Sequence, residues 1–190
     1  MQNIDNKTRC FGSQSQLYAN YHDHEWGRPV HDDQRLFEML ILEGAQAGLS
    51  WETVLKKREG YRKAFHNFDI QKVANMSDSE LEALRENDQI IRNRLKIYAA
   101  RTNAQAAISV QNEFGSLSNF LWAFVGNKPI KNSWQTLKDV PIKTPESDAL
   151  AKALKKQGMK FVGTTIMYAF MQAVGMVNDH ISTCWCRSSQ

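Results

Sequence analysis

The sequence predicts an all-α protein, and three observations lead to this fold class. Apolar residues recur at spacings of three and four over several segments, as expected of helices with one buried face. No segment alternates apolar and polar residues in the way that indicates a half-buried strand. Near the C-terminus, two predicted helices are joined by a short turn with a glycine at each end. We expect a single domain over residues 1–190, with a flexible start over residues 1–9.

The composition is that of a folded, mildly basic protein. Hydrophobic residues make up 42% of the chain, and the net charge of +4 permits an acidic partner such as nucleic acid without requiring one. No apolar run approaches the ~20 residues of a membrane span, and the polar N-terminus does not resemble a signal peptide. We therefore expect a cytoplasmic monomer that binds no membrane and keeps its three cysteines reduced.

In the first half of the chain, helices are predicted from caps and apolar spacing. Asp32 and Asp33 can cap a helix with a buried face that ends near Gly48. The next helix is predicted over residues 51–57. A further apolar set follows it at Tyr61, Ala64, Phe65 and Phe68.

The second half is predicted in the same way. Ser77 and Glu80 form a capping box, and a long helix follows over about residues 89–113. A short helix is expected around residues 120–125. Residues 126–146 contain three of the four prolines and form the least regular part. Thr144 or Ser147 can cap the helix that leads into the C-terminal hairpin.

The predicted hairpin covers about residues 154–175. Its turn runs from Gly158 through Lys160 to Gly163, and its second helix begins at Thr164 and Thr165. Glycine allows a tight turn and a close approach of another backbone, and the N–H groups at a helix N-terminus can bind phosphate. The pattern therefore predicts a contact with a nucleic-acid backbone. The alternative is an ordinary helical hairpin with a solvated lysine face.

Four side chains from the two ends of the chain could form a metal site. Cys10 and His22 lie near the N-terminus, and His180 and Cys184 lie near the C-terminus. Two thiolates and two imidazoles can complete a tetrahedral zinc site that has no open position, so such a zinc would be structural. Cys186 and His24 compete for ligand places. The alternative is an exposed Cys10 thiol, an ordinary polar His22 and a buried Cys184.

A second group of residues resembles a ligand pocket. Glu43 lies at an apolar helix end, where it is either on the solvent face or buried for a purpose. Trp51, Tyr18, Tyr21 and Trp26 could surround it with flat aromatic faces. Aromatic walls around one carboxylate suit a planar cationic or amine-bearing heterocycle. The alternative places these aromatic residues in the core and Glu43 at the surface.

Several segments together resemble a known family. They are LYANYHDHEWG (17–27), LFEMLILEGAQAGLSW (36–51), TVLKKRE (53–59) and SDALAKALKKQGMKFVGTTIMYAFMQAVGMVNDH (147–180). These segments closely resemble 3-methyladenine DNA glycosylase I, a family of helix-hairpin-helix DNA glycosylases. The resemblance implies that fold, with one structural zinc joining the N- and C-terminal segments.

The resemblance also implies roles for individual residues. It places the zinc ligands at Cys10, His22, His180 and Cys184, and so sets Cys186 aside. It makes Glu43 the residue that reads the base, with Trp51, Tyr18, Tyr21 and Trp26 around the base. It assigns DNA contacts to the hairpin residues Gly158, Lys160, Gly163, Thr164 and Thr165. Residues 46–49, including Gln46 and Leu49, would fill the gap left by the extruded nucleotide. The chain departs from the family pattern at Phe11 and Gly12, where a small residue followed by an aromatic one is expected.

The implied reaction is hydrolysis of the N-glycosidic bond of 3-methyladenine in double-stranded DNA, after the base is flipped into the pocket. Related enzymes that also nick DNA use a lysine just after the hairpin glycines, where this chain has Thr164 and Thr165. We therefore expect no lyase activity. Asp179 receives no role in the chemistry. Two other functions remain as alternatives: a non-catalytic DNA-binding domain held together by a structural zinc, and a metallohydrolase. The first would not need a carboxylate among aromatic residues, so Glu43 argues against it.

Overall fold

The computed structural model describes residues 6–187, and most of them are helical. The helices are α1 (Gln16–His24), α2 (Asp33–Gln46), α3 (Trp51–Ala64), α4 (Ile70–Ala74), α5 (Asp78–Ala83), α6 (Arg94–Phe114), α7 (Leu117–Trp122), α8 (Pro145–Lys156) and α9 (Thr164–Ala173). Three short 3-10 turns are η1 (His66–Phe68), η2 (Leu84–Glu86) and η3 (Ala123–Val125). The two strands are β1 (Ile130–Lys131) and β2 (Val177–Asn178). None of the described helices is long and apolar enough to cross a membrane.

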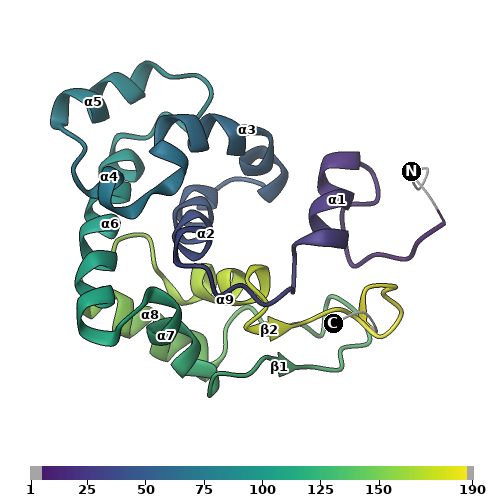
Figure 1. The fold of residues 1–190 in the computed structure, drawn as a ribbon. Helices are drawn as coiled ribbons and strands as arrows, with labels where there is room; N and C mark the ends of the chain where they lie inside the picture. The colour runs from purple at the N-terminus through teal and green to yellow at the C-terminus, as the bar shows by residue number, and fades with distance from the viewer. Residues whose placement is uncertain (1–5, 188–190) are drawn as a thin grey trace.

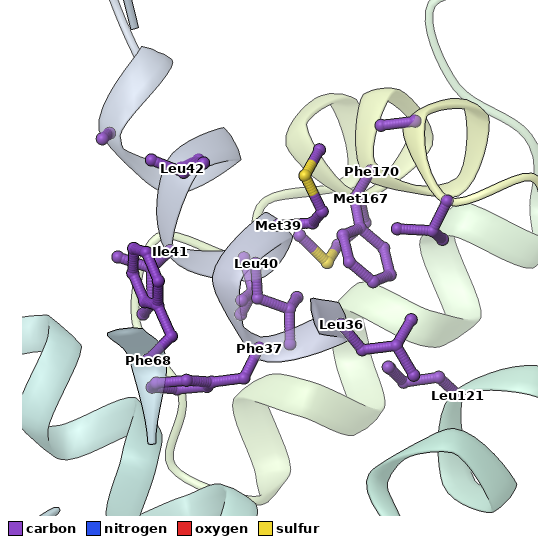
Figure 2. Close-up of a cluster of buried hydrophobic side chains, with 14 of the residues drawn as sticks. Leu36, Phe37, Met39, Leu40, Ile41, Leu42, Phe68, Leu121, Met167 and Phe170 are labelled. Carbon is purple, nitrogen blue, oxygen red and sulfur yellow. The ribbon is translucent and has the colours of Figure 1, made fainter. Parts of the chain in front are cut away.

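Helix α2 is the centre of the core. Ten consecutive residues, 36–45, are buried, because α2 contacts α3, α6, α7 and α9 on its different sides. Figure 2 shows Leu36 and Leu40 of α2 beside Met167 and Phe170 of α9, with Phe68 and Leu121 completing the cluster. Residues buried on every side of a helix are normally apolar, so the two carboxylates in this stretch, Glu38 and Glu43, are exceptional.

A buried ionic network fixes α1 against α2 and α3. Arg58 of α3 donates to Glu38 of α2 (Nε–Oε1, 2.8 Å) and to Glu25 at the end of α1 (Nη1–Oε2, 2.8 Å). Arg35 pairs with both carboxylates, and Arg62 pairs with Glu38. Burial raises the pKa of Glu38, but the charges of Arg58 and Arg35 outweigh it, and the net pKa is lowered. Three helices are therefore held in one relative position beside the site described below.

Several predicted caps and helix ends are confirmed. The Asp32 side chain accepts from the Arg35 N–H at the start of α2, and Ser77 with Glu80 forms the predicted capping box. Thr144 is the N-cap of α8, with Ser147 completing a second capping box. Helix α9 begins at Thr164, as predicted.

Other predictions were wrong in detail. Helix α3 runs to Ala64, seven residues beyond the predicted end at residue 57, and α6 begins at Arg94 because the Asn93 side chain caps it. Two short strands pair in parallel, with Ile130 opposite Val177 and Lys131 opposite Asn178. The fold is therefore mostly helical but not purely α. The sequence analysis did not predict the strands because two residues are too few to produce a period-2 pattern.

The segment after β2 lies beside the beginning of the chain, as Figure 1 shows for the region around α1 and β2. The Trp185 N–H donates to the Thr8 carbonyl (3.0 Å). Arg9 is buried and donates two hydrogen bonds to Asp23 (2.8 and 2.7 Å). The expected flexible start therefore does not extend to Arg9, whereas residues 1–5 lie outside the described residues.

Candidate functional site: an aromatic pocket beside a His/Cys cluster

A pocket of about 350 Å³ opens between α1, the C-terminal part of α2 and α9. We call it the aromatic pocket. It is lined by Phe11, Tyr18, Tyr21, Trp26, Glu43, Gln46, Trp51, Leu137, Val140, Pro141, Ile142, Thr165, Tyr168, Ala169 and Gln172. All five residues predicted to form the pocket are among them, so the structure brings together side chains from three separate segments of the sequence.

Glu43 is the one carboxylate among the residues that line the aromatic pocket. Its side chain is 3% exposed, and Oε2 has no hydrogen-bond partner among the described residues. Burial disfavours the charged form and raises the pKa of Glu43 to about 8. A buried, unpaired acid is costly, and of the two readings left open for Glu43 the structure confirms the buried one.

The aromatic residues that line the pocket together with Glu43 pack against one another. The rings of Tyr21 and Trp51 lie 5.4 Å apart, and Trp51 Nε1 is buried without a hydrogen-bond partner among the described residues. Phe11 packs edge-on against Trp26, with ring centroids 4.9 Å apart, and in a tilted arrangement against Tyr18, also at 4.9 Å. Flat rings beside two unpaired polar atoms suit a planar ligand that has hydrogen-bonding edges.

Residues 46–49 form a tight turn at the end of α2. The Leu49 N–H donates to the Gln46 carbonyl, Gly48 has a positive φ of 82°, and Leu49 is 41% exposed. Lys96 of α6 donates to the carbonyls of Ala45 and Ala47, at 2.8 Å each. The turn is thereby fixed with Leu49 exposed, beside a groove of about 220 Å³ that also contacts Glu43.

The hairpin between α8 and α9 differs in one respect from the predicted turn. Gly158 has a positive φ of 89°, but Gly163 has φ −67° and is the N-cap of α9. The second left-handed residue is Phe161, with φ 57°. Asn103 of α6 binds both backbone groups of Lys160, at 2.7 and 3.0 Å, which holds this strained turn in place.

The two hairpin threonines have different surroundings. The Thr164 hydroxyl lies 3.0 Å from that of Ser147, so it joins α9 to α8. Thr165 is exposed and lines the aromatic pocket. Because Gly163 has no side chain, the first N–H groups of α9 receive no side-chain cap from it.

A buried cluster of histidines and cysteines lies directly behind the pocket. We call Cys10, His22, His180, Cys184 and Cys186 the His/Cys cluster. Single ligand atoms of His22, His180, Cys184 and Cys186 all lie within 4.8 Å of one another. Phe11 and Trp26 connect the cluster to the pocket, since the ring of Phe11 lies 4.9 Å from that of His22, and Trp26 lies 4.5 Å from His180.

Both histidines present Nε2 to this cluster. Nδ1 of His22 lies 2.9 Å from Asp23 Oδ1, and Nδ1 of His180 lies 3.0 Å from Asn178 Oδ1. Because both oxygens only accept, each Nδ1 carries the proton and each Nε2 offers a lone pair. His180 Nε2 is buried and has no partner among the described residues. Burial lowers the pKa of His180 to about 4 and so keeps it neutral, as metal binding requires.

The cysteines compete for the remaining ligand places. A hydrogen bond from Cys10 lowers the pKa of Cys184 to about 4, and the same bond raises the pKa of Cys10. Cys184 Sγ lies 3.4 Å from His22 Nε2. Cys186, which the sequence analysis set aside, belongs to the tightest group of four, and the geometry does not support its exclusion. Its Sγ contacts the other edge of His22, 3.9 Å from Nδ1, where Asp23 already binds. Burial raises the pKa of Cys186 to about 12.

Comparison with known proteins identifies the family. The family model described as methyladenine glycosylase matches residues 11–188. The chain belongs to the methyladenine glycosylase family. It is 50% identical over 184 residues to a DNA-3-methyladenine glycosylase from Haemophilus influenzae, covering 96% of this chain and 99% of the relative. It is 53% identical to DNA-3-methyladenine glycosylase 1 from Escherichia coli, covering 94% and 96%.

A solved structure supports the same assignment. It is 3-methyladenine DNA glycosylase I from Staphylococcus aureus, described for its recognition of 3-methyladenine. It superposes on this methyladenine glycosylase with a TM-score of 0.91 at 36% identity, covering 94% of this chain and 95% of that one.

Sequence reasoning missed part of this methyladenine glycosylase's pocket. Tyr168 and Gln172 line it from α9, in a stretch that reads as an ordinary apolar helix. Leu137, Val140, Pro141 and Ile142 line it from the proline-containing region, which carries no periodic signal. The one available signal was Phe11, an aromatic residue directly after a predicted metal ligand and at a point where the family pattern shifts.

Proposed function

We propose that this protein removes 3-methyladenine from alkylated DNA by hydrolysing the N-glycosidic bond, in base excision repair. The observation that carries the proposal is the buried, unpaired Glu43 in a pocket with aromatic walls. Relatives that share half of its residues bear the name of this activity. We propose that residues 1–190 act as one helix-hairpin-helix glycosylase domain, as a monomer on double-stranded DNA.

Methylation at N3 makes adenine cationic within the nucleoside, so the base is already a good leaving group. The enzyme therefore needs little general acid, and binding of the extruded cation is its main task. A positive charge next to Glu43 favours the carboxylate and opposes the effect of burial on its pKa. We propose that Glu43 ionises as the base enters, accepts from the amine edge and stabilises the cation, while Trp51 stacks on the ring.

Ionised Glu43 would also favour 3-methyladenine over methylated guanines. At the same edge a guanine presents a carbonyl oxygen, so an acceptor would face an acceptor at a buried carboxylate. Such a mismatch leaves two buried polar groups unpaired, which is costly. Tyr18, Tyr21 and Trp26 complete a pocket that accepts a purine and positions it against Glu43.

The DNA would lie across the pocket mouth, between the 46–49 turn and the hairpin. Leu49 is exposed at the end of α2 and would enter the gap left by the flipped nucleotide, with Gln46 beside it. The N–H groups at the start of α9, with Gly158, Lys160, Gly163 and Thr164, would bind a backbone phosphate. Thr165 also lines the pocket, so we place it next to the extruded nucleotide.

We also propose one structural zinc, bound by Cys10, His22, His180 and Cys184. The orphaned Nε2 of His180 and the thiolate character of Cys184 fit this ion. Both Cys10 and Cys186 hydrogen-bond to Cys184. We choose Cys10 because Cys186 contacts the Nδ1 edge of His22, where Asp23 already binds. Four protein ligands would leave no position for substrate, so the zinc would hold the two chain ends together and support Phe11 and Trp26.

The first test is base release from methylated duplex DNA. We expect rapid release of 3-methyladenine and little 7-methylguanine or 3-methylguanine, because only the first presents a donor to Glu43. Chromatography of the released bases measures the three rates separately. If a folded, zinc-replete sample releases no base, the glycosylase proposal is contradicted. The hairpin would then serve only to bind DNA, and the protein would be a non-catalytic DNA-binding domain.

A second expected result is the absence of a covalent intermediate. Among the described residues that line the aromatic pocket there is no lysine to form a Schiff base. Treatment with borohydride during turnover on methylated DNA should therefore trap no protein–DNA adduct, and the abasic product should remain unnicked. A bifunctional glycosylase on its own substrate is the positive control. A trapped adduct would contradict the monofunctional mechanism.

A further inference from the structure

Asp179 follows directly after β2 and makes four hydrogen bonds from a position that is 1% exposed. Its Oδ1 accepts from Asn132 Nδ2 and from Trp134 Nε1, both at 2.7 Å. Its Oδ2 accepts from the Tyr168 hydroxyl at 2.6 Å and from Gln172 Nε2 at 2.7 Å. Each oxygen thus uses both of its strong acceptor positions, and Asp179 is not among the residues that line the aromatic pocket.

The four donors come from two different walls of the pocket. Tyr168 and Gln172 lie on α9, and both line the pocket. Asn132 and Trp134 lie in the segment of residues 132–142, which we call the wall segment. Farther along, its residues Leu137, Val140, Pro141 and Ile142 line the pocket, whereas Asp139 does not. Oδ1 therefore binds the wall segment, and Oδ2 binds α9.

The wall segment has little regular structure of its own to hold it. It follows β1, and beyond Trp134 it contains only turns and bends. Ser182 donates its N–H to the Trp134 carbonyl at 2.8 Å, and its hydroxyl donates to Gln135. Ile142 at its far end is 74% exposed. Asn132 also donates its N–H to the Asn178 carbonyl (3.1 Å), Arg187 donates to Ser133 (2.8 Å), and Val140 packs against the core. Of these contacts, none joins the wall segment to Tyr168 and Gln172 of α9 through hydrogen bonds, as Asp179 does.

We propose that Asp179 is a positioning residue that fixes the two walls of the aromatic pocket relative to each other. It does so by binding Tyr168 and Gln172 with one carboxylate oxygen and the wall segment with the other. The inference rests on the proposed function, because it takes the aromatic pocket as the site that holds the flipped base. It predicts that loss of Asp179 weakens binding of the flipped base. The DNA-binding surface formed by the 46–49 turn and the hairpin should remain unchanged.

The test is Asp179→Asn in the full-length, zinc-replete protein. The amide has the same size, but it replaces one accepting oxygen with an NH₂ group that would face two donors. We expect kcat for release of 3-methyladenine to fall at least ~10-fold and the affinity for free 3-methyladenine to fall by a similar factor. The affinity for duplex DNA with an abasic site should stay within about twofold of wild type, because it reports the DNA surface. Zinc content is measured in the same samples, since Asp179 is next to His180 in sequence.

Asp139→Asn is the matched control. Asp139 lies in the same wall segment and accepts from the N–H and hydroxyl of Thr136, so the same chemical change there leaves the link to α9 intact. We expect wild-type kcat and base affinity for this variant.

Trp134→Phe tests the link if Asp179→Asn fails to fold or loses zinc. It removes one donor to Oδ1 and leaves the acid in place. We expect a smaller loss of kcat and base affinity, again with unchanged binding of abasic DNA. Where Asp179→Asn folds, the effects of the two changes should not add, because both act through one carboxylate.

These measurements distinguish a failure of the proposed glycosylase function from a failure of the proposed role of Asp179. A wild-type protein that releases no 3-methyladenine would refute the proposed function. If the wild type is active and Asp179→Asn has the same kcat and base affinity, the positioning role is refuted. If Asp179→Asn does not fold or loses zinc, wild-type kcat and base affinity in Trp134→Phe refute it instead. A loss of abasic-DNA affinity equal to the loss of base affinity would also refute it, because a general structural role would then explain both.

Discussion

Replacing Glu43 with glutamine is expected to lower the rate of 3-methyladenine release by roughly 10²-fold or more. Glutamine has nearly the same shape, so the pocket should keep its form. It cannot ionise, however, so it would no longer stabilise the cationic base, and its NH₂ group could donate to a guanine carbonyl. The ratio of 3-methyladenine to 7-methylguanine release should therefore fall as well. Single-turnover kinetics on methylated duplex DNA measure both effects.

The same substitution should stabilise the protein at alkaline pH, which distinguishes loss of function from loss of fold. Burial raises the pKa of Glu43 to about 8 from an ordinary value of 4.5. As pH rises from 4.5 to 8, the unfolded chain ionises here while the folded protein stays protonated, so the wild type loses stability over this range. Above pH 8 the cost levels off on the order of 3–5 kcal/mol, and Glu43→Gln avoids it.

Urea unfolding of both proteins at pH 5 and pH 9 tests this expectation. The variant should be clearly more stable at pH 9, with a much smaller difference at pH 5. Glu59→Gln is the control, since the Glu59 side chain on α3 is 72% exposed and should affect neither activity nor the pH profile. Equal stability of wild type and Glu43→Gln at pH 9, or an unchanged rate and base preference, would contradict the role assigned to Glu43.

Cys10→Ser is expected to remove the zinc, whereas Cys186→Ser should retain it. Both cysteines are buried near Cys184, so the pair compares the two candidates for the fourth ligand place with the same chemical change. The cluster joins His22 to Cys184 across 162 positions of the chain, so its loss releases a very long loop. We expect Cys10→Ser to lower the free energy of unfolding by on the order of 3–5 kcal/mol and Tm by roughly 10 °C.

Metal analysis and thermal unfolding, with and without a chelator, measure this prediction. Chelation should lower the Tm of the wild type and of Cys186→Ser, with little further effect on Cys10→Ser. Base affinity should fall with the zinc, because Phe11 follows Cys10 directly and lines the pocket. The opposite result, zinc lost in Cys186→Ser and kept in Cys10→Ser, would assign the fourth place to Cys186.

Much of the architecture was readable from local sequence patterns. The Asp32 cap, the Ser77 capping box and the start of α9 were all predicted in place, because caps and apolar periodicity act over a few residues. Glu43 was identified for a similar reason. A carboxylate within the apolar stretch of residues 40–51 is a local conflict, and such conflicts are expected at functional sites.

The tertiary structure alone decided which distant residues meet. Tyr168 and Gln172 face the pocket because α9 packs beside α2, and the wall segment, whose Asn132 and Trp134 donate to Asp179, comes from a distant part of the chain. Cys186 joins the His/Cys cluster, and Phe161 takes the left-handed conformation expected of a hairpin glycine, because Asn103 holds the neighbouring backbone. Contacts between residues far apart in the chain leave no periodic signal in the sequence. The sequence by itself therefore determined most of the helices and singled out Glu43, because both depend on local patterns. The tertiary packing alone decided which distant side chains complete the pocket and that Cys186 lies with His22, His180 and Cys184.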